Sequence, residues 1–200
     1  MPKRLRSEPI YLAPDILAWR DDDYRPCIID QRNGRMLNPY SVDDKIFIYE
    51  RQVQEWFINR AKSLIARKQN NFVVLMIAVA YIEGNEQYRR GQSSDRKSKR
   101  FFRYGFQRIF HIPESESNNI DRLYEHLRCG LFHNGMSGDA IVLNRKLSTA
   151  IVFSAGGTID INPRLFLAEV VEDFNVYLEE LRDVNNESLR SNFNTMFEVV

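Results

Sequence analysis

The order of apolar and polar positions along the chain predicts a mainly helical fold. The first amphipathic helix follows a cap at Ser41 or Asp43 and ends by Asn70. Its apolar positions recur every three or four residues, at Val53, Phe57, Ala61 and Leu64. A second helix starts at Phe72 and is apolar on nearly all sides, so we expect it to be the most buried helix before it turns polar at Glu83.

Two more helices follow the exposed loop 91–98. The third ends before Pro113, and its apolar members are Phe101, Phe102, Phe106, Ile109 and Phe110. The fourth is capped by Asn118 or Asn119, and its apolar positions are Ile120, Leu123, Leu127 and Leu131. We expect Gly130 to weaken this helix and Gly135 to end it.

Period-two patterns and turn residues predict two small β elements. Asn33-Gly34 stands between two short apolar runs and indicates a hairpin. The β-branched stretch 140–161 predicts two or three short antiparallel strands with a turn at Gly156-Gly157. Pro163 then opens the last long helix.

The fold class is therefore a mainly α bundle of four to five helices, with an N-terminal β hairpin and a small β insertion before the last long helix. We expect an N-terminal extension over residues 1–44 and a helical domain over 45–200. The tail predicts one more short helix that ends in an apolar cluster. This cluster needs a covering surface in the same chain or another, and it consists of Phe193, Met196, Phe197, Val199 and Val200.

Composition limits the class of protein. With 200 residues, 44% hydrophobic and 28% charged, the chain is an ordinary globular protein, not a disordered or fibrous one. The longest apolar run, 72–82, is too short to cross a bilayer, so we expect no membrane partner. Cys27 and Cys129 are far apart and indicate no disulfide framework, which favours a cytoplasmic protein.

The net charge of +1 hides an uneven distribution. Residues 89–108 hold eight basic residues and one acidic residue, a local charge of +7, whereas residues 160–200 carry a charge of −6. Basic side chains can neutralise phosphates, so the first stretch is a candidate RNA-binding segment, while its Phe residues are expected in the core. The candidate RNA-binding residues are Arg89, Arg90, Arg96, Lys97, Lys99, Arg100 and Arg103.

The stretch RLYEHLRCGLFHNG, residues 122–135, contains Arg128 followed after four residues by His133. An Arg, four to six residues and a His at the end of a helix resemble the motif of the HEPN superfamily (higher eukaryote and prokaryote nucleotide-binding domains). The apolar helix with a polar end at Glu83 and the long closing helix are also similar to that family. Catalytic members often have Asn directly after the Arg, where this chain has Cys129.

The resemblance implies a metal-independent endoribonuclease without a cofactor, of the kind found in defence or toxin–antitoxin systems. Its partners would be RNA, a second copy of the chain in a homodimer, and an antitoxin or other protein. Arg128 and His133 would be catalytic, with the amide of Asn134 assisting. Arg122, His126 and Glu83 are possible accessory residues.

On an ideal α-helix, Arg128 and His133 would point about 140° apart, because five residues turn about 500°. We therefore expect either that Gly130 breaks the helix or that a second copy completes the site.

Two other interpretations stay open. The chain could be a non-catalytic HEPN-like module that dimerises and binds RNA or a nucleotide, or a structural scaffold in which Arg128 is a helix-end charge. Cys129 and His133 have helical spacing for two metal ligands, but no third and fourth ligand stand nearby in sequence, so no metal site is expected.

Overall fold

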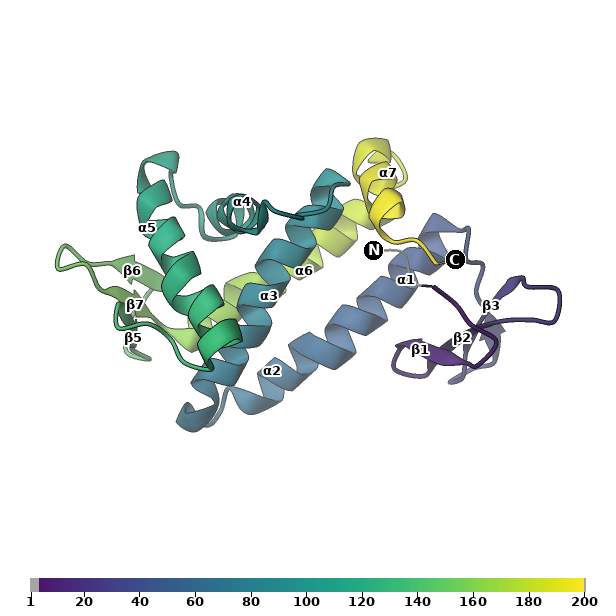
Figure 1. The fold of residues 1–200 in the computed structure, drawn as a ribbon, viewed down its shortest axis with the longest axis horizontal. Helices are drawn as coiled ribbons and strands as arrows, with labels where there is room; N and C mark the ends of the chain where they lie inside the picture. Colours follow the sequence, from purple (N-terminus) through teal and green to yellow (C-terminus); the bar gives the residue numbers. More distant parts are fainter. Residues whose placement is uncertain (1–3, 200) are drawn as a thin grey trace. The chain divides into compact units, whose positions relative to one another are not determined.

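The computed structural model describes residues 4–199 and confirms the predicted fold class: the chain is mainly helical and carries two small sheets (Figure 1). Contacts between Cα atoms divide the chain into two compact units. Unit 1 comprises the residues up to 60, residues 88–93 and those from 176 onward, and unit 2 comprises 61–87 and 94–175. The predicted boundary between residues 44 and 45 stays a prediction.

Unit 1 begins with a four-stranded antiparallel sheet whose strands are in sequence order. The hairpin predicted at Asn33-Gly34 is confirmed, since it joins the last two strands, and Gly34 takes the positive φ of +72° that the turn requires. The first two strands were not predicted; Asp15, at φ +60°, turns the chain between them. The strands are β1 (Ile10–Ala13), β2 (Ile16–Arg20), β3 (Pro26–Asp30) and β4 (Arg35–Met36).

The first long helix starts where the sequence predicts it. The hydroxyl of Ser41 accepts a hydrogen bond from the backbone N–H of Asp44 at 3.3 Å, which caps α1. The helix runs on without a break through a π-helical turn and ends at Leu64, within the predicted limit at Asn70. Its parts are α1 (Val42–Val53), η1 (Gln54–Ile58) and α2 (Asn59–Leu64), followed by the 3₁₀ turn η2 (Lys68–Asn70).

The predicted tail helix is α7 (Glu187–Met196), and unit 1 itself covers its apolar residues. Phe193 and Phe197 are buried, and both rings pack edge-on against Tyr49 of α1, at 5.4 and 5.9 Å between centroids. Val199 is also buried, and Val200 lies outside the described residues. The tail therefore contributes to the core of its own chain.

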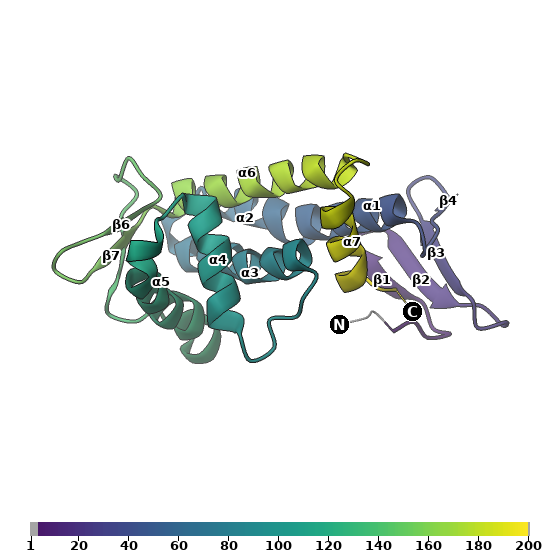
Figure 2. The same ribbon diagram turned by 90° about the horizontal axis from the view of Figure 1, so that it is seen from above.

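Unit 2 is built on the helix that the sequence marks as most buried, α3 (Asn71–Arg90), whose Leu75, Ala78 and Val79 are fully buried. Helix α4 (Ser98–Phe110) crosses α3 steeply (Figures 1 and 2). The crossing is close, because a Cβ atom at Gly105 would lie 2.7 Å from the backbone oxygen of Ile82. As predicted, the Phe residues of α4 belong to the core.

The fourth helix begins differently from the prediction. Helix α5 (Ser117–Leu123) starts one residue before Asn118, and Glu116 at its N-cap makes no side-chain capping bond. The 3₁₀ turn η3 (Glu114–Glu116) leads directly into the helix, and the Ser117 hydroxyl donates to the carbonyl of Glu114 at 2.7 Å. The predicted caps at Asn118 and Asn119 are therefore wrong, since both residues fall inside the first turn.

The β insertion precedes the long helix α6 (Pro163–Arg182), which begins at the predicted proline. Its strands are β5 (Ile141–Leu143), β6 (Ile151–Phe153) and β7 (Ile159–Ile161), in the order β5-β7-β6. The prediction of antiparallel strands is correct for β6 and β7, which meet in a turn at Gly157, but wrong for β5 and β7. The chain reverses once into β6 and again into β7, so the central strand runs parallel to β5.

Within residues 4–199, no helix is both long and apolar enough to span a membrane.

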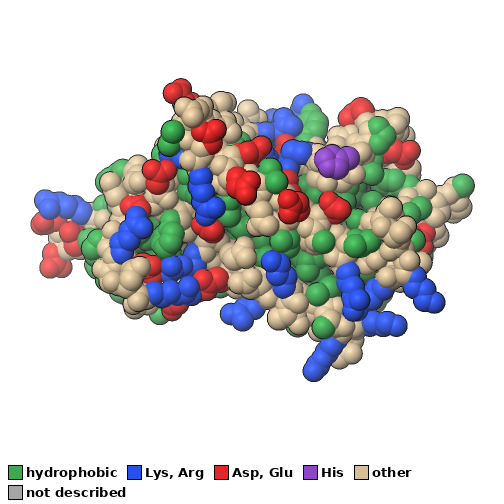
Figure 3. Space-filling view, turned by 180° about the vertical axis from the view of Figure 1, so that it is seen from behind, with side chains coloured by type: hydrophobic (Ala, Val, Ile, Leu, Met, Phe, Trp, Pro, Cys, Tyr) green, Lys and Arg blue, Asp and Glu red, His purple; other side chains and the backbone are tan. Residues whose placement is uncertain are grey.

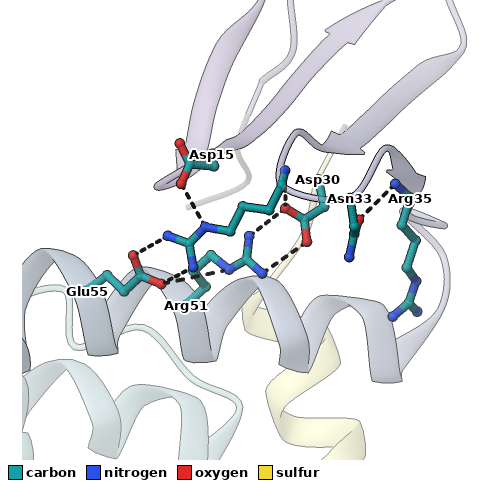
Figure 4. A network of polar contacts seen from close by, with 7 residues as sticks. Asp15, Asp30, Asn33, Arg35, Arg51 and Glu55 are labelled. Atoms are coloured by element: carbon teal, nitrogen blue, oxygen red, sulfur yellow. Dashed lines mark hydrogen bonds and ion pairs between the residues drawn. The ribbon is translucent and has the colours of Figure 1, made fainter.

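A network of charged side chains ties the sheet of unit 1 to helix α1 (Figure 4). Arg51 of α1 donates to both carboxylate oxygens of Asp30 on β3, at 2.6 and 3.0 Å, and the Asp30 side chain is fully buried. The hydrogen bond from Arg51 holds the pKa of Asp30 below its usual value of 3.8. Nearby, Arg32 pairs with Asp15 and Glu55, but both Arg32 and Asp15 are about half exposed.

We expect Asp30→Ala to lower the free energy of unfolding of unit 1 by about 3–5 kcal/mol, because the largely buried Arg51 loses both short hydrogen bonds and, among the described residues, keeps only Glu55, at 4.0 Å, beside its charge. Asp15→Ala removes an exposed pair and should cost only about 0–1 kcal/mol. Urea unfolding followed by tryptophan fluorescence measures both, since the two tryptophans of the chain, Trp19 and Trp56, belong to unit 1.

The same pair predicts a pH dependence. Because the pKa of Asp30 is lowered in the folded state, its contribution is complete above pH 3.8 and is lost as the pH falls through the folded value. The stability difference between wild type and Asp30→Ala should therefore narrow as the pH falls below 3.8. A difference that stays constant through the acid range would contradict the role of this ion pair.

Candidate functional site

The Arg/His motif lies on a π-helix. Helix α5 continues without a break into η4 (Tyr124–Asn134), and we call Ser117–Asn134 the motif helix. Gly130 does not break it, and it ends as predicted at Gly135, which has φ +68°. In a π-helix each N–H bonds the carbonyl five residues before it, so the helix has more residues per turn than an α-helix, and residues five apart diverge much less around the axis. Arg128 and His133 therefore share one side of the helix, and the expected separation of about 140°, which holds for an α-helix, is wrong here.

Arg128 is held by a buried carboxylate. Its guanidinium pairs with Glu83 of α3 at 3.0 Å, and the exposed fractions of the two side chains are 24% and 11%. The other oxygen of Glu83 accepts the hydroxyl proton of Ser94 at 2.8 Å, in the loop after α3. Both oxygens of Glu83 are thus occupied, and the carboxylate fixes Arg128 while leaving part of the guanidinium open to solvent.

Two aromatic rings flank the same guanidinium. The Arg128 carbon Cζ lies 5.5 Å from the ring centre of Tyr124 and 5.2 Å from that of Phe132. Tyr124 is buried and Phe132 is 45% exposed. Burial raises the pKa of the Tyr124 hydroxyl.

His133 is exposed, and within the described part of the chain its side chain has no hydrogen bond or ion pair. Its imidazole is thus accessible to a ligand on the side of the helix where Arg128 lies.

Other polar candidates on the motif helix line a hollow that includes neither Arg128 nor His133. The hollow, of about 240 Å³, is lined by Glu125, His126, Gly130, Asn134, Met136, Ser137 and Gly138. Asn134, predicted to assist Arg128 and His133, lines this hollow instead. The accessory candidate His126 lies 3.5 Å from the carboxylate of Asp139.

Two glycines let the loop 136–138 close onto the motif helix. The N–H of Gly138 donates to the carbonyl of His126 at 2.7 Å. A Cβ atom at Gly130 would lie 2.6 Å from the carbonyl oxygen of Met136, and one at Gly138 would overlap the imidazole of His126. Gly130 thus packs against backbone and does not break the helix, which was one of the two expected alternatives. The sequence gives no sign of the role of Gly138, because its contact with His126 is not local.

Arg122 holds the β insertion in place. Its guanidinium donates to the backbone oxygen of Gly157 at 2.8 Å, in the turn between β6 and β7. This accessory candidate therefore connects the motif helix to the insertion rather than pointing toward Arg128.

Much of the basic segment 89–108 is neutralised inside the protein. In unit 2, Lys99 forms an ion pair with Glu125 at 2.7 Å. Arg103 donates two hydrogen bonds to the carboxylate of Asp121, at 3.0 and 2.6 Å. Arg108 pairs with Asp173 and Glu86. In unit 1, Arg89 pairs with Glu180 at 2.8 Å, and Arg90 is exposed but not without a partner.

The solvent-exposed basic side chains of unit 2 in this segment are those of Arg96, Lys97 and Arg100. Arg100 donates to the hydroxyl of Tyr104 at 2.7 Å, and Arg96 and Lys97 have no ion pair among residues 4–199. Figure 3 shows basic and acidic side chains both present on the face it displays, with hydrophobic ones between them. In the described part of the chain, no three His, Cys, Asp or Glu side chains cluster in a way that could hold a metal ion.

No protein-family model, no curated protein and no solved structure matches this chain.

We expect Gly130→Ala to push the loop 136–138 off the motif helix and to destabilise unit 2 by about 1–3 kcal/mol, because its Cβ meets backbone that cannot rotate away. The amide of Gly138 should then exchange its hydrogen faster, which NMR or mass spectrometry measures. Gly84→Ala is the matched control: it lies inside α3 with nothing within 4 Å, and should stabilise by up to about 1 kcal/mol. Equal protection of Gly138 in the Gly130→Ala variant would show that the contact is not needed.

Proposed function

We propose that this chain is a metal-independent endoribonuclease of the HEPN type. The observation that carries the proposal is the π-helical period of the motif helix, which gives Arg128 and the exposed His133 one common side. An active site often coincides with such a departure from regular helix geometry. A single copy of the chain can therefore present both groups to one phosphodiester.

The chemistry follows from the two side chains. A neutral His133 takes the proton from a ribose 2′-OH, and the 2′ oxygen attacks the adjacent phosphorus. The bond from phosphorus to the 5′ oxygen breaks, and the leaving oxygen takes a proton from the His133 imidazolium, which returns to its neutral form. Arg128 donates hydrogen bonds to the phosphate oxygens as negative charge grows on them. The products are a 2′,3′-cyclic phosphate and a 5′-OH end, and only RNA has the required nucleophile.

Glu83 is the positioning residue in this proposal. Its carboxylate fixes the rotamer of Arg128, so less side-chain freedom is lost when the guanidinium meets a phosphate. The exposed Arg96, Lys97 and Arg100 are the groups best placed to attract RNA, whereas phosphates would have to displace carboxylates to reach Lys99 or Arg103.

The wider setting is also proposed from the resemblance: a cytoplasmic protein of a defence or toxin–antitoxin system, acting as a homodimer and held in check by a protein partner. The site geometry no longer requires the second copy, because the α-helical angle that called for it does not apply.

Two observations favour a non-catalytic binding module instead. Arg128 already has a carboxylate partner, and Cys129 stands where catalytic members often carry Asn. Such a module would bind RNA in a salt-dependent way without cutting it.

The test is cleavage of total RNA and of a defined single-stranded oligoribonucleotide, in the presence of EDTA. We expect His133→Ala to slow cleavage by about 10²- to 10⁴-fold and Arg128→Ala by about 10²- to 10³-fold. His133→Ala is the cleaner variant, since its side chain is exposed, while Arg128→Ala leaves Glu83 without its partner and needs a circular-dichroism check of the fold.

Two matched controls should cleave like the wild type. His111→Asn changes a histidine at the end of α4, where the φ of +53° suits Asn, and Arg164→Ala changes an exposed arginine at the start of α6. The new 5′ ends should accept phosphate from polynucleotide kinase without prior dephosphorylation. Cleavage that continues unchanged in His133→Ala, or at a 2′-deoxy nucleotide, would refute the proposal.

A further inference from the structure

Phe132 is an exposed aromatic ring beside the two proposed catalytic groups. It is 45% exposed, whereas Phe102, Phe106 and Phe166 in the same unit are fully buried. It directly precedes His133 on the motif helix, and its ring centre lies 5.2 Å from the guanidinium carbon of Arg128. Its exposure is not predictable from the sequence, because a Phe in an amphipathic helix is usually a core residue.

We propose that Phe132 is the platform on which an unpaired RNA base stacks, next to the phosphodiester that Arg128 and His133 contact, and hence that the substrate is single-stranded RNA. This inference rests on the proposed function. Stacking needs an accessible ring face near a phosphate-binding group, and Phe132 and Arg128 together supply both. In a duplex the faces of each base are covered by its neighbours, so paired RNA would not use this ring.

The ring is also oriented before any ligand binds. Its contact with Arg128 links it to a guanidinium that the buried Glu83 fixes, so Phe132 is joined to a firmly held group. A platform that is ordered in the free protein loses less conformational entropy on binding.

A second copy of the chain fits this surface less well than a base does. The apolar side chains exposed here are Phe132 and, 70% exposed, Met136, while His133, Asn134 and Gly135 around them are polar or small and also exposed. The exposed part of Phe132 amounts to roughly 100 Å². A stable dimer buries roughly 800 Å² on each partner, so this patch alone is far too small to hold one.

Binding is measured with a fluorescent single-stranded 2′-O-methyl oligonucleotide, which cannot be cleaved because its nucleophile is blocked. We expect Phe132→Ala to weaken binding by roughly 5- to 150-fold, the range for loss of one base–aromatic stack. Phe132→Tyr and Phe132→Trp should restore binding, whereas Phe132→Leu, which keeps the bulk without the ring, should not. Met136→Leu serves as the control for exposed apolar bulk and should change binding less than two-fold.

The salt dependence of RNA affinity distinguishes base stacking from charge interactions. The affinity loss in Phe132→Ala should be the same at low and high salt, because no phosphate contact is removed. Arg100→Ala should instead reduce the dependence of affinity on salt.

Phe132→Trp adds a direct probe. The tryptophans of the wild type belong to unit 1, so the extra fluorescence reports on the motif helix. This signal should be quenched by single-stranded RNA and not by an RNA duplex. Wild-type binding by Phe132→Leu, equal losses for duplex and single strand, or a change of Phe132→Ala from dimer to monomer with unchanged RNA affinity would each overturn the inference.

The two proposals fail in distinguishable ways. A wild-type protein that binds the 2′-O-methyl strand through Phe132 but cleaves no RNA would refute the nuclease and leave the stacking platform. A protein that cleaves through His133 while Phe132→Ala binds and cleaves normally would refute only the platform.

Discussion

The π-helical hydrogen bonding of the motif helix, from each N–H to the carbonyl five residues before it, is the constraint on which the proposed site depends. It brings Arg128 and His133 closer to one side of the helix than an α-helix would, while the loop 136–138 packs against His126 and Gly130. Had the same residues formed an α-helix, the two proposed catalytic groups would diverge by about 140°. In the proposed site, the backbone geometry is therefore what allows Arg128 and His133 to reach the same phosphodiester, and the identity of the two residues alone would not suffice.

A π-helix is rare because its wider turn packs its own atoms less well, so its neighbours must stabilise it. Here the carbonyl of His126 accepts the N–H of Gly138, and Gly130 admits the backbone of Met136 against the helix. The ion pair of Arg128 with Glu83 also ties the helix to α3. Contacts with the loop and with α3 thus hold a segment that its own hydrogen bonds would hold less firmly.

The features of the fold that can be predicted from the sequence are those encoded in a local pattern of residues. The spacing of apolar residues gives the helices, Ser41 and Pro163 give two of their starts, and the aromatic positions of α4 are correctly assigned to the core. The π-helical geometry leaves no such trace, because the apolar positions fit an α-helix equally well, including Leu127 and Leu131 inside the π-helical part. The contacts that stabilise the π-helix join Gly130 and His126 to a loop, so they are not encoded in the local pattern. The parallel pairing of β5 with β7 is also non-local, because β6 comes between them in the sequence.

Charge counted along the sequence is likewise an incomplete guide to the charge that the folded protein presents. The count of +7 in residues 89–108 is correct as a sum, but Asp121 and Glu125, which pair with Lys99 and Arg103, lie outside that window. Pairs this close to solvent contribute about 0–1 kcal/mol, so a phosphate can replace the carboxylate of Glu125 at small cost. The pair of Arg128 with Glu83 is more buried, and it persists while the exposed charges exchange partners. A near-neutral chain can therefore still present a fixed guanidinium to a polyanion, since the local field and not the net charge of +1 acts on a bound strand.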